Sequence, residues 1–519
     1  MSISTIHGER RHRALEFIQA RPLTIAFMLL TIGALTPILL VRVAPLADFV
    51  NHLSRMHVIA VAGKDPFLDA FYRIDWSVLP NLAMDLVVPM LARLTNVYVA
   101  GQAFLVAMVL LLVTGPMAIS YSLTRRINAW PLVGFLFLYN GVFLTGLVNY
   151  LAGVGIGMWG LAVWILLRER HLALRMVVSA LFVLALFFCH LSAVGLYGLS
   201  IGAFELWDWY RRGRRFGLAE LKVVVALAVP AIPIVPLLMM SPTWGLALDY
   251  EWSSQSKLDG LMTVIRIYSD TLDMGLIGLA ALAFAWGVQR RFIRFHPAAL
   301  PYALISVAVY MALPNVLFGS YMGDQRLAIA MVLTLIGFGR LETNEKQIRI
   351  ALLVIVVAFS TIRFVDVGVH WVHLGRIYEQ FRVALTKVPI GSKILVAYAD
   401  DEESDESDRD ALSHAACLGI IERSSLVSTA FTVKGKQVMT VRDEYRARVD
   451  TEDGFPPTVS RLLVGSESED DGGNYWDDWE ENHDFIVVLY GAQDTATPDP
   501  DELEEVASGD GFKLYKILH

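Results

Sequence analysis

Charged residues are scarce in this chain. Only 18% of its 519 residues are Asp, Glu, Lys or Arg, whereas 55% are hydrophobic, and the mean hydropathy is +0.51. A water-soluble protein of this length needs polar residues to cover its surface. This composition therefore argues against a soluble protein and favours a chain that is solvated largely by lipid.

Cysteine and the common catalytic motifs are also nearly absent. Cys189 lies in an apolar run and Cys417 in the acidic C-terminal region, so we expect no disulfide, and two residues cannot form a cysteine-based metal site. The sequence contains no P-loop, no HExxH and no GxSxG in a strand–turn–helix context. The missing P-loop argues against ATP-driven transport by this chain alone.

Long apolar runs are what the sequence has in abundance. A helix needs about 20 apolar residues to cross the hydrocarbon core of a bilayer. We predict about eleven spans, the first of them an uncleaved helix that follows a basic N-terminal stretch. The predicted spans are 24–43, 100–122, 129–147, 149–167, 174–190, 192–209, 220–239, 272–288, 299–314, 326–339 and 350–369.

The basic clusters between the spans predict the orientation. With the N-terminus in the cytoplasm, every short cluster falls in a cytoplasmic loop, as the positive-inside rule requires. The clusters are Arg125-Arg126, Arg168 through Arg175, Arg211 through Arg215, Gln289 through Arg294 and Arg340 through Arg349. The odd number of spans then places the C-terminus outside. We expect a multi-pass protein of a bacterial inner membrane.

Two regions outside the spans complete the predicted architecture. Residues 79–94 are apolar, but counting them as a span would move every later basic cluster outside, so we predict a helix that lies along the outer membrane surface. The stretches KILVAY, FIVVLY and FKLYKIL read as short buried strands of an acidic α/β domain. We therefore predict a mainly α-helical membrane domain over 1–387, including the first outer loop 44–99, and a small soluble extracytoplasmic domain over 388–519.

The strongest candidate for chemistry follows the first span. If Asp48 opens a helix, Asp48, His52 and Arg55 share one helical face at the outer membrane surface. A carboxylate there can accept a proton, and a guanidinium can hold a phosphate. The alternative is that Asp48 only caps the helix and the face behind it is solvated.

Further candidates lie on the same predicted side of the membrane. Arg326 opens an apolar helix, where it can bind a lipid phosphate or only reach the headgroups, and Asp85 needs a partner that Arg55 or Lys64 can supply. Aromatic and acidic residues in the loop 240–271 suit either a sugar or a membrane interface. The other candidates for an outward cleft are Asn81, Asn149, Tyr150, Trp244, Asp249, Glu251, Lys257 and Asp324.

These residues resemble the GT-C superfamily of membrane glycosyltransferases. Asp48 matches the acidic residue that opens the first outer loop of those enzymes, 57–95 their amphipathic loop, and 390–519 their outer domain. The phrases ADFVNHLSR, GLVNYLAGVGIG and CHLSAVG are similar to segments of bacterial GT-C-like proteins. Several GT-C families carry a second acid near the first, whereas Phe49 and Val50 follow Asp48 here.

The resemblance implies transfer of a sugar from a polyprenyl-phosphate donor to a glycan, lipid or protein acceptor outside the cytoplasm. Asp48 would be the catalytic base of an inverting displacement, with His52, Arg55 and Arg326 at the donor phosphate. Membrane lipid is the other expected partner, and no nucleic acid is expected. At most one cofactor, a divalent cation such as Mg²⁺ or Mn²⁺, fits this mechanism.

Three alternatives remain open at this point. A transporter or flippase of a lipid-linked sugar would need ionisable residues in mid-membrane and two repeated halves, and the sequence offers mainly His190. A metal-independent ligase or polymerase would use outer arginines and a histidine. A non-catalytic cell-envelope assembly protein would need no catalytic base at all.

The predicted orientation can be tested with reporters at the C-terminus. Alkaline phosphatase fused after His519 should be active, and a green fluorescent protein fused there through the same secretion route should be dark. The same reporters fused after Arg126, in a predicted cytoplasmic loop, should give the opposite result. A cytoplasmic C-terminus would contradict the mechanism above, because the donor and Asp48 would then lie on the wrong side.

Overall fold

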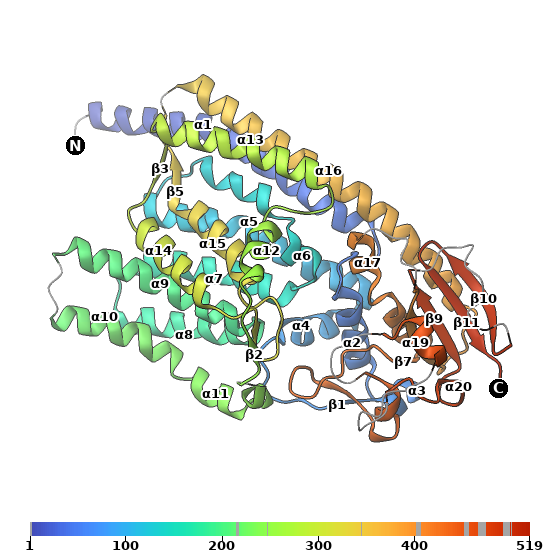
Figure 1. Ribbon diagram of the computed structural model, residues 1–519. Helices are drawn as coiled ribbons and strands as arrows, with labels where there is room; N and C mark the ends of the chain where they lie inside the picture. Colours follow the sequence, from blue (N-terminus) through green and yellow to red (C-terminus); the bar gives the residue numbers. More distant parts are fainter. Residues whose placement is uncertain are drawn as a thin grey trace.

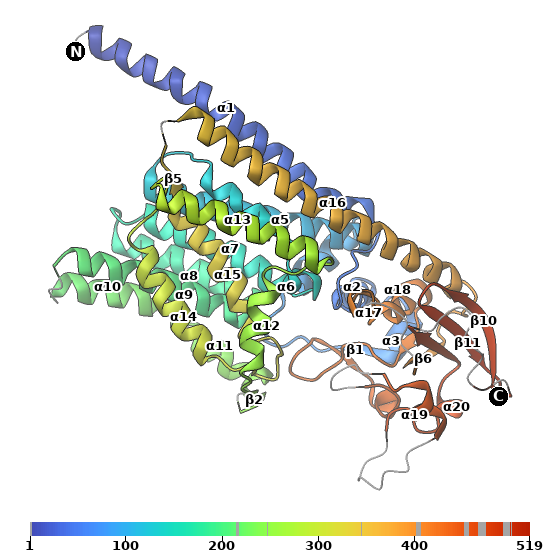
Figure 2. The ribbon, with the colours of Figure 1, turned by 45° about the horizontal axis from the view of Figure 1, so that its top comes forward.

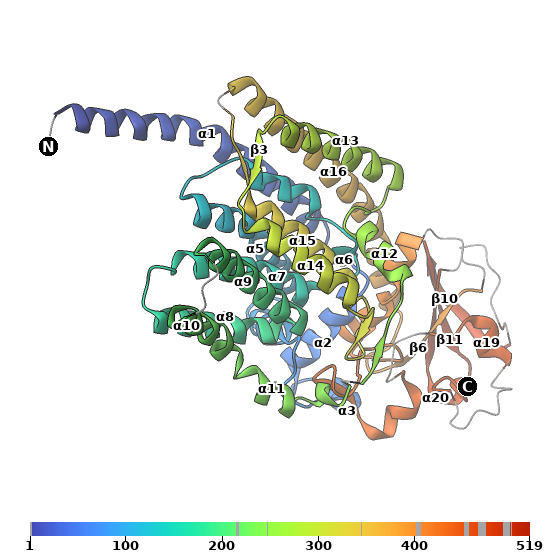
Figure 3. The same cartoon turned by 60° about the vertical axis from the view of Figure 1, so that its left-hand side comes forward.

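The computed structural model describes residues 3–213, 217–246, 248–343, 345–400, 406–450, 456–464, 474–490, 499 and 501–519. Arg214 and Arg215, which belong to one predicted basic cluster, lie outside this set. In Figure 1 a bundle of helices occupies most of the molecule, and the C-terminal strands gather at the end opposite the N-terminus. Figure 3 shows the same separation from another side.

The described residues form twenty α-helices. They are α1 (Ile3–Leu40), α2 (Phe49–Val61), α3 (Pro66–Phe71), α4 (Ala83–Ala92), α5 (Val97–Thr124), α6 (Gly141–Leu144), α7 (Val148–Leu166), α8 (Leu172–Cys189), α9 (Leu191–Arg211), α10 (Leu218–Ala228), α11 (Ile234–Met240), α12 (Gln255–Thr263), α13 (Asp270–Gln289), α14 (Ala299–Ala312), α15 (Gln325–Phe338), α16 (Lys346–Leu385), α17 (Glu406–Leu412), α18 (Leu418–Arg423), α19 (Val459–Val464) and α20 (Trp479–Asn482). Short 3-10 helices are η1 (Trp130–Phe137), η2 (Val229–Ala231), η3 (Pro242–Leu246), η4 (Ala415–Cys417) and η5 (Asp443–Arg448).

Seven helical segments in the described part of the chain are long and apolar enough to cross a membrane. They are Pro22–Leu40, Val97–Thr124, Val148–Leu166, Leu172–Cys189, Leu221–Met240, Asp270–Gln289 and Lys346–Leu385. Three of the four other predicted spans coincide with α9 and with the shorter apolar helices α14 and α15. The protein is thus a helical multi-pass membrane protein, as predicted.

One predicted span is not a continuous helix. Residues 129–147 form the 3-10 helix η1 and the four-residue helix α6, joined by a turn at Asn140. The Asn140 carboxamide accepts the backbone N–H of Phe143 and so caps α6, which interrupts the helical pattern inside an apolar run. Apolar composition alone did not reveal this break.

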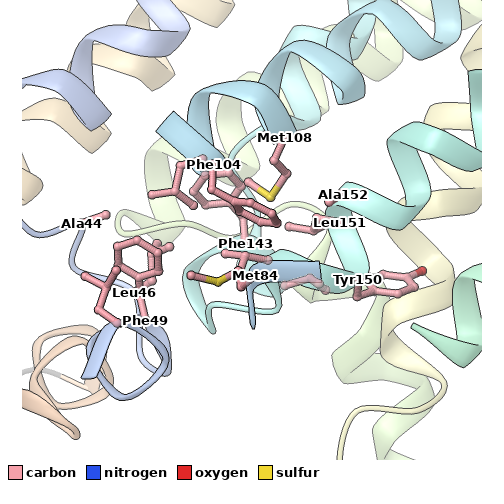
Figure 4. Packing of buried hydrophobic residues seen from close by; sticks show 14 of the residues in the cluster. Ala44, Leu46, Phe49, Met84, Phe104, Met108, Phe143, Tyr150, Leu151 and Ala152 are labelled. Atoms are coloured by element: carbon pink, nitrogen blue, oxygen red, sulfur yellow. The ribbon is translucent and has the colours of Figure 1, made fainter. Parts of the chain in front are cut away.

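The core of the bundle forms where α5 and α7 cross. An added Cβ at Gly155 would lie 2.6 Å from the Leu111 Cβ, and one at Gly115 would lie 2.7 Å from the Met158 methyl carbon. Small residues at such a crossing let two membrane helices approach closely. Figure 4 shows how side chains from α2, α4, α6 and α7 join those of α5 in one apolar cluster.

Helices α1 and α16 lie side by side and run in the same direction (Figures 1 and 2). Gly33 packs on Phe364, and further along both helices Val41 packs on Gly375. Their C-terminal ends therefore lie on the same side of any membrane that both helices cross. At 40 residues α16 is about 60 Å long, twice the thickness of the hydrocarbon core, so it extends well past the predicted span.

The C-terminal strands form a five-stranded mixed sheet in the order β10-β11-β9-β6-β7. The strands β6 (Lys393–Tyr398), β9 (Phe485–Leu489) and β11 (Phe512–Ile517) coincide with the three predicted strands, and β7 (Leu426–Val427) and β10 (Leu503–Gly509) complete the sheet. β6 is parallel to β7 and β9, whereas β11 is antiparallel to β9 and β10. Alternate residues face opposite sides, as strand geometry requires: Ile394 and Val396 join the main core, and Leu395 and Ala397 pack with α19.

A small second sheet joins the loop after α1 to the C-terminal region. Strand β1 (Tyr72–Ile74) pairs with β8 (Met439–Val441) in antiparallel register, with Tyr72 opposite Val441. The other two-stranded ribbons pair β2 (Tyr250–Glu251) with β4 (Val316–Leu317) and β3 (Ile293–Phe295) with β5 (Gly339–Leu341). Since β1 and β8 pair directly, the first loop and the C-terminal sheet share one side of the membrane.

Helix α4 covers most of the predicted surface segment 79–94. Its Met84, Asp85 and Val88 are buried against the protein, whereas Leu86, Val87 and Met90 are 42%, 44% and 68% exposed. One apolar face therefore remains uncovered by protein. This is the pattern expected of a helix lying in a membrane surface.

Candidate functional site

Asp48 directly precedes α2, and its backbone is held by the loop around α6. The Asp48 N–H donates to the Thr145 carbonyl (3.1 Å), and the Ala47 N–H donates to the Leu144 carbonyl (2.9 Å). Gly146 passes so close that an added Cβ would lie 3.1 Å from the Asp48 nitrogen, and its φ of 89° also favours glycine. The Asp48 carboxylate makes no capping bond to α2, so it is free for another role.

One cavity of about 600 Å³ brings most of the predicted residues together. It is lined from α2, α7, the start of α15, and the C-terminal region. The predicted residues in its wall are Asp48, His52, Asn81, Asn149, Tyr150 and Arg326. The wall also contains His190, which the sequence offered only as an ionisable residue in mid-membrane. Residues of the wall that sequence reasoning did not select include Tyr398, Arg409, Asp410, His414, Phe431, Lys436 and Tyr490.

The Asp48 carboxyl group is a poor acid in this setting. Burial raises its pKa to about 7, and the nearby Asp410 acts in the same direction, whereas the positive charges of Arg326 and Arg55 oppose the shift. The group is thus close to half ionised at neutral pH. A carboxylate with this pKa can take a proton and hold it, which is what a general base must do.

His414, from the C-terminal region, faces Asp48. Its Nε2 lies 3.8 Å from the Asp48 Oδ1, and its Nδ1 lies 3.3 Å from the Asn51 carboxamide nitrogen. Burial lowers the pKa of His414 to about 4, so the ring is neutral at pH 7. The ring of Phe431 packs edge-on against both His414 and His52, and burial lowers the pKa of His52 as well.

Asn51 determines which nitrogen of His414 carries the proton. The Asn51 Oδ1 accepts the Phe431 N–H (2.9 Å), and its Nδ2 donates to the Thr429 carbonyl (3.0 Å), so the orientation of the amide is unambiguous. The same Nδ2 can only donate to Nδ1 of His414, which must then be the unprotonated nitrogen. The proton of the neutral ring therefore sits on Nε2 and faces Asp48.

Arg326 is the buried cation of the cavity. Its Nη1 lies 2.7 Å from Nε2 of His190, its Nη2 donates to the Tyr321 carbonyl (2.6 Å), and its own carbonyl accepts the Tyr150 hydroxyl. Its Nε is buried and has no hydrogen-bond partner. Among the described residues no carboxylate oxygen lies within 4.0 Å of this guanidinium, so its charge is available to an anion in the cavity.

Arg55 and Asp85 bind each other instead of lining the cavity. The Arg55 Nε and Nη2 donate to the two Asp85 oxygens at 2.8 and 3.2 Å, and both side chains are almost completely buried. Of the two partners that the sequence offered for Asp85, Arg55 and Lys64, the structure pairs it with Arg55. The predicted phosphate contact of Arg55 has no support in this geometry, because its guanidinium is already paired and ties α2 to α4.

Two further predicted residues, Asn149 and Asp324, form hydrogen bonds that hold neighbouring helices in place. Asn149 lines the cavity, but its carboxamide accepts the Met84 N–H and donates to Asn81, which attaches α7 to the start of α4. Asp324 caps α15 and binds Lys257 (2.7 Å) and Ser256, so it anchors α12 beside Arg326. The hydrogen bonds of Asn149 and those of Asp324 therefore position the helices that form the wall of the cavity.

The remaining candidates of the loop 240–271 lie outside the cavity wall. Trp244 is 51% exposed, Asp249 and Glu251 are also exposed, and Glu251 belongs to β2. Among the described residues, no group of three or more His, Cys, Asp or Glu side chains could hold a metal ion. We therefore assign no step to the divalent cation that the sequence left open.

The comparison with known proteins supports the predicted fold class. No protein-family model and no curated protein matches this chain. A crystal structure of ArnT from Cupriavidus metallidurans bound to undecaprenyl phosphate matches over 95% of this chain and 96% of that one, with 12% identity and a TM-score of 0.50. The same protein in the apo state matches over 97% and 98%, with 13% identity and a TM-score of 0.47. This chain thus shares the fold of ArnT over nearly the full length of both chains.

Because the Arg55–Asp85 ion pair is buried, we expect the stability of the protein to depend strongly on both residues. Asp85→Leu should lower the free energy of unfolding by about 3–5 kcal/mol, because it leaves a buried guanidinium unpaired. Arg55→Met combined with Asp85→Leu should recover much of this loss, as measured by thermal unfolding in detergent. The exposed pair Arg73–Asp75 is the matched control, and Asp75→Leu there should change stability by less than about 1 kcal/mol. Equal losses in the single and double variants would contradict the pairing.

Proposed function

We propose that this protein transfers a sugar from a polyprenyl-phosphate donor to an acceptor hydroxyl on the extracytoplasmic side of a membrane. The observation that carries the proposal is that Asp48 and Arg326 line the same cavity. The Asp48 carboxyl group makes no capping bond to α2, and the Arg326 guanidinium has no carboxylate partner among the described residues. A base and a separate anion site are the two groups that displacement of a phosphate by a hydroxyl requires. The fold shared with ArnT, whose structure holds undecaprenyl phosphate, is consistent with this class of donor.

Asp48 is the proposed base. The acceptor oxygen attacks the anomeric carbon, its proton passes to Asp48, and the bond from the anomeric carbon to the phosphate oxygen breaks in the same displacement. The configuration at the anomeric carbon is thereby inverted. The Nε2–H of neutral His414 faces the ionised form of Asp48, so His414 is a positioning residue that favours the reactive state.

Arg326 is the proposed site of the leaving phosphate. The negative charge that develops on the phosphate is compensated by a cation that is already buried and oriented by His190 and Tyr321, so little reorganisation is needed during the reaction. Lys436 and Arg409 add basic side chains from the C-terminal region to the same wall. Tyr398 and Tyr490, whose ring centroids are 4.8 Å apart, give the wall an aromatic surface suited to a sugar ring.

Asp48→Asn should lower turnover by about 10²–10⁴-fold, because the variant cannot accept the proton. Turnover is measured as release of prenyl phosphate from a prenyl-phosphate sugar, by mass spectrometry. Asp259→Asn, an exposed residue of α12, is the control and should leave the rate unchanged. Normal turnover in Asp48→Asn would contradict the assignment of the base.

The pKa of Asp48 also predicts a pH profile. Only the ionised form can act as base, so turnover of the wild type should rise about tenfold from pH 6 to pH 8 and then level off. Because folding raises this pKa above its unfolded value, the ionised carboxylate reduces stability as pH rises from about 4 through 7. Asp48→Asn should therefore be more stable than the wild type, by a larger margin at pH 8 than at pH 5. This result would show that the variant is folded and that its loss of turnover has another cause.

Arg326→Gln should weaken binding of undecaprenyl phosphate by more than about tenfold, because the variant leaves the phosphate without its buried cation. Binding is measured by native mass spectrometry or tryptophan fluorescence on the full chain. Arg340→Gln is the matched control, since Arg340 follows the other end of α15 and is exposed there in a pair with Glu342. Unchanged affinity in Arg326→Gln would contradict the proposed phosphate site.

A further inference from the structure

We propose that the seam between α1 and α16 binds an anionic membrane phospholipid, with its acyl chain along an apolar groove and its phosphate at Arg42 and Arg376. Two adjoining hollows of about 560 and 820 Å³ share Leu40, Val372 and Arg376 in their walls, so they form one groove along the seam. The groove shares no lining residue with the cavity at Asp48. This site goes beyond the proposed sugar transfer and does not depend on it.

The first half of the groove has the length and composition of an acyl-chain site. It runs along α16 from Thr361 to Val372 and along α1 from Gly33 to Leu40, and Val365 and Val369 are each about 60% exposed within it. Eleven steps of an α-helix span about 16 Å, which is close to half of the roughly 30 Å hydrocarbon core. An added Cβ at Gly368 would meet no atom within 4 Å, so the groove is open at this point.

The second half of the groove is basic. Arg42 follows the end of α1 by two residues, and Arg376 lies beside Gly375, which packs on Val41, so both arginines are level with the end of the first span. Lys387 lies further along the same wall. Glu379, the acidic residue of the wall, is bonded to Arg382 at 2.7 and 2.9 Å, so it does not neutralise these cations. The charge therefore complements a lipid phosphate at headgroup level.

The position of the seam favours a lipid over a soluble anion. Only 28% of the α1 span and 22% of the α16 span are buried within the protein, so both helices present most of their apolar surface to the surroundings. An apolar groove that ends in two exposed arginines suits a molecule with both a chain and a phosphate. The groove extends over about one leaflet, which matches a phospholipid chain better than a long prenyl chain.

The test uses the purified full-length protein and native mass spectrometry with three probes. Phosphatidylglycerol should be retained in preference to phosphatidylcholine, and glycerol 1-phosphate, which lacks the chains, should not compete. Arg42→Gln combined with Arg376→Gln should reduce phosphatidylglycerol binding about 25-fold, at about fivefold for each charge removed. Lys64→Gln combined with Arg93→Gln removes two exposed charges elsewhere on the first loop and should have no such effect.

A second variant tests the apolar half without touching the charges. Gly368→Leu places a side chain in open groove space and should reduce retention of both phospholipids, while turnover and undecaprenyl phosphate binding at the Asp48 cavity remain. Unchanged phosphatidylglycerol binding in the arginine double variant would overturn the proposal. So would competition by glycerol 1-phosphate, which would indicate a soluble anion site, or displacement by undecaprenyl phosphate, which would indicate a prenyl site.

Discussion

The buried amide of Asn51 connects the two ends of this chain, and the shape of the candidate site depends on it. Asn51 lies on α2, in the loop after α1, and its carboxamide bonds to the backbone at Thr429 and Phe431 and to the His414 ring. A buried amide left without partners costs more than each bond gains, so this contact strongly opposes separation of the two regions. The pairing of β1 with β8 acts in the same way. Without these contacts, Asp48 would lose the part of the cavity wall that the C-terminal region supplies.

The partners of the buried arginines distinguish those with a structural role from the candidate for phosphate binding. Arg55 is paired with Asp85, and Arg363 of α16 is paired with Asp273 of α13 at 2.6 Å, so each charge is compensated inside the protein. Arg326 is equally buried, yet it is held by a histidine and a carbonyl oxygen. A buried cation without a paired carboxylate is costly unless an anion completes its surroundings. This difference, rather than the presence of an arginine, identifies Arg326 as the stronger phosphate candidate.

The long helix α16 gives the protein a rigid connection between membrane and sheet. It packs beside α1 at Phe364 and beside Val41 at Gly375. Further along the helix, Phe381 packs on Phe512 of the C-terminal sheet. The Tyr378 hydroxyl donates to the Ala411 carbonyl of α17, close to His414. The same continuous helix therefore contacts both α1 and the segment that carries His414.

The sequence alone determined the features that depend on local pattern. Hydrophobic runs, basic clusters and alternating strands predicted the helical membrane fold and the strands β6, β9 and β11, because hydrocarbon solvation and strand alternation act on neighbouring residues. The position of Asp48 after the first span and the i, i+4 spacing to His52 were likewise readable. The break at Asn140 was not, since a single capping side chain overrode an apolar run.

Only the tertiary structure decided which polar residues meet. The sequence places Asp48, His52 and Arg55 on one helical face. In the structure α2 packs against α4, so that Arg55 forms an ion pair with Asp85, whereas Asp48 and His52 line the cavity. His414 and Phe431 come from more than 350 residues further along the chain, and no local signal marks them, because their placement follows from long-range hydrogen bonds to Asn51. The pKa of Asp48 is likewise a property of the assembled wall, since desolvation exists only once both ends of the chain have come together.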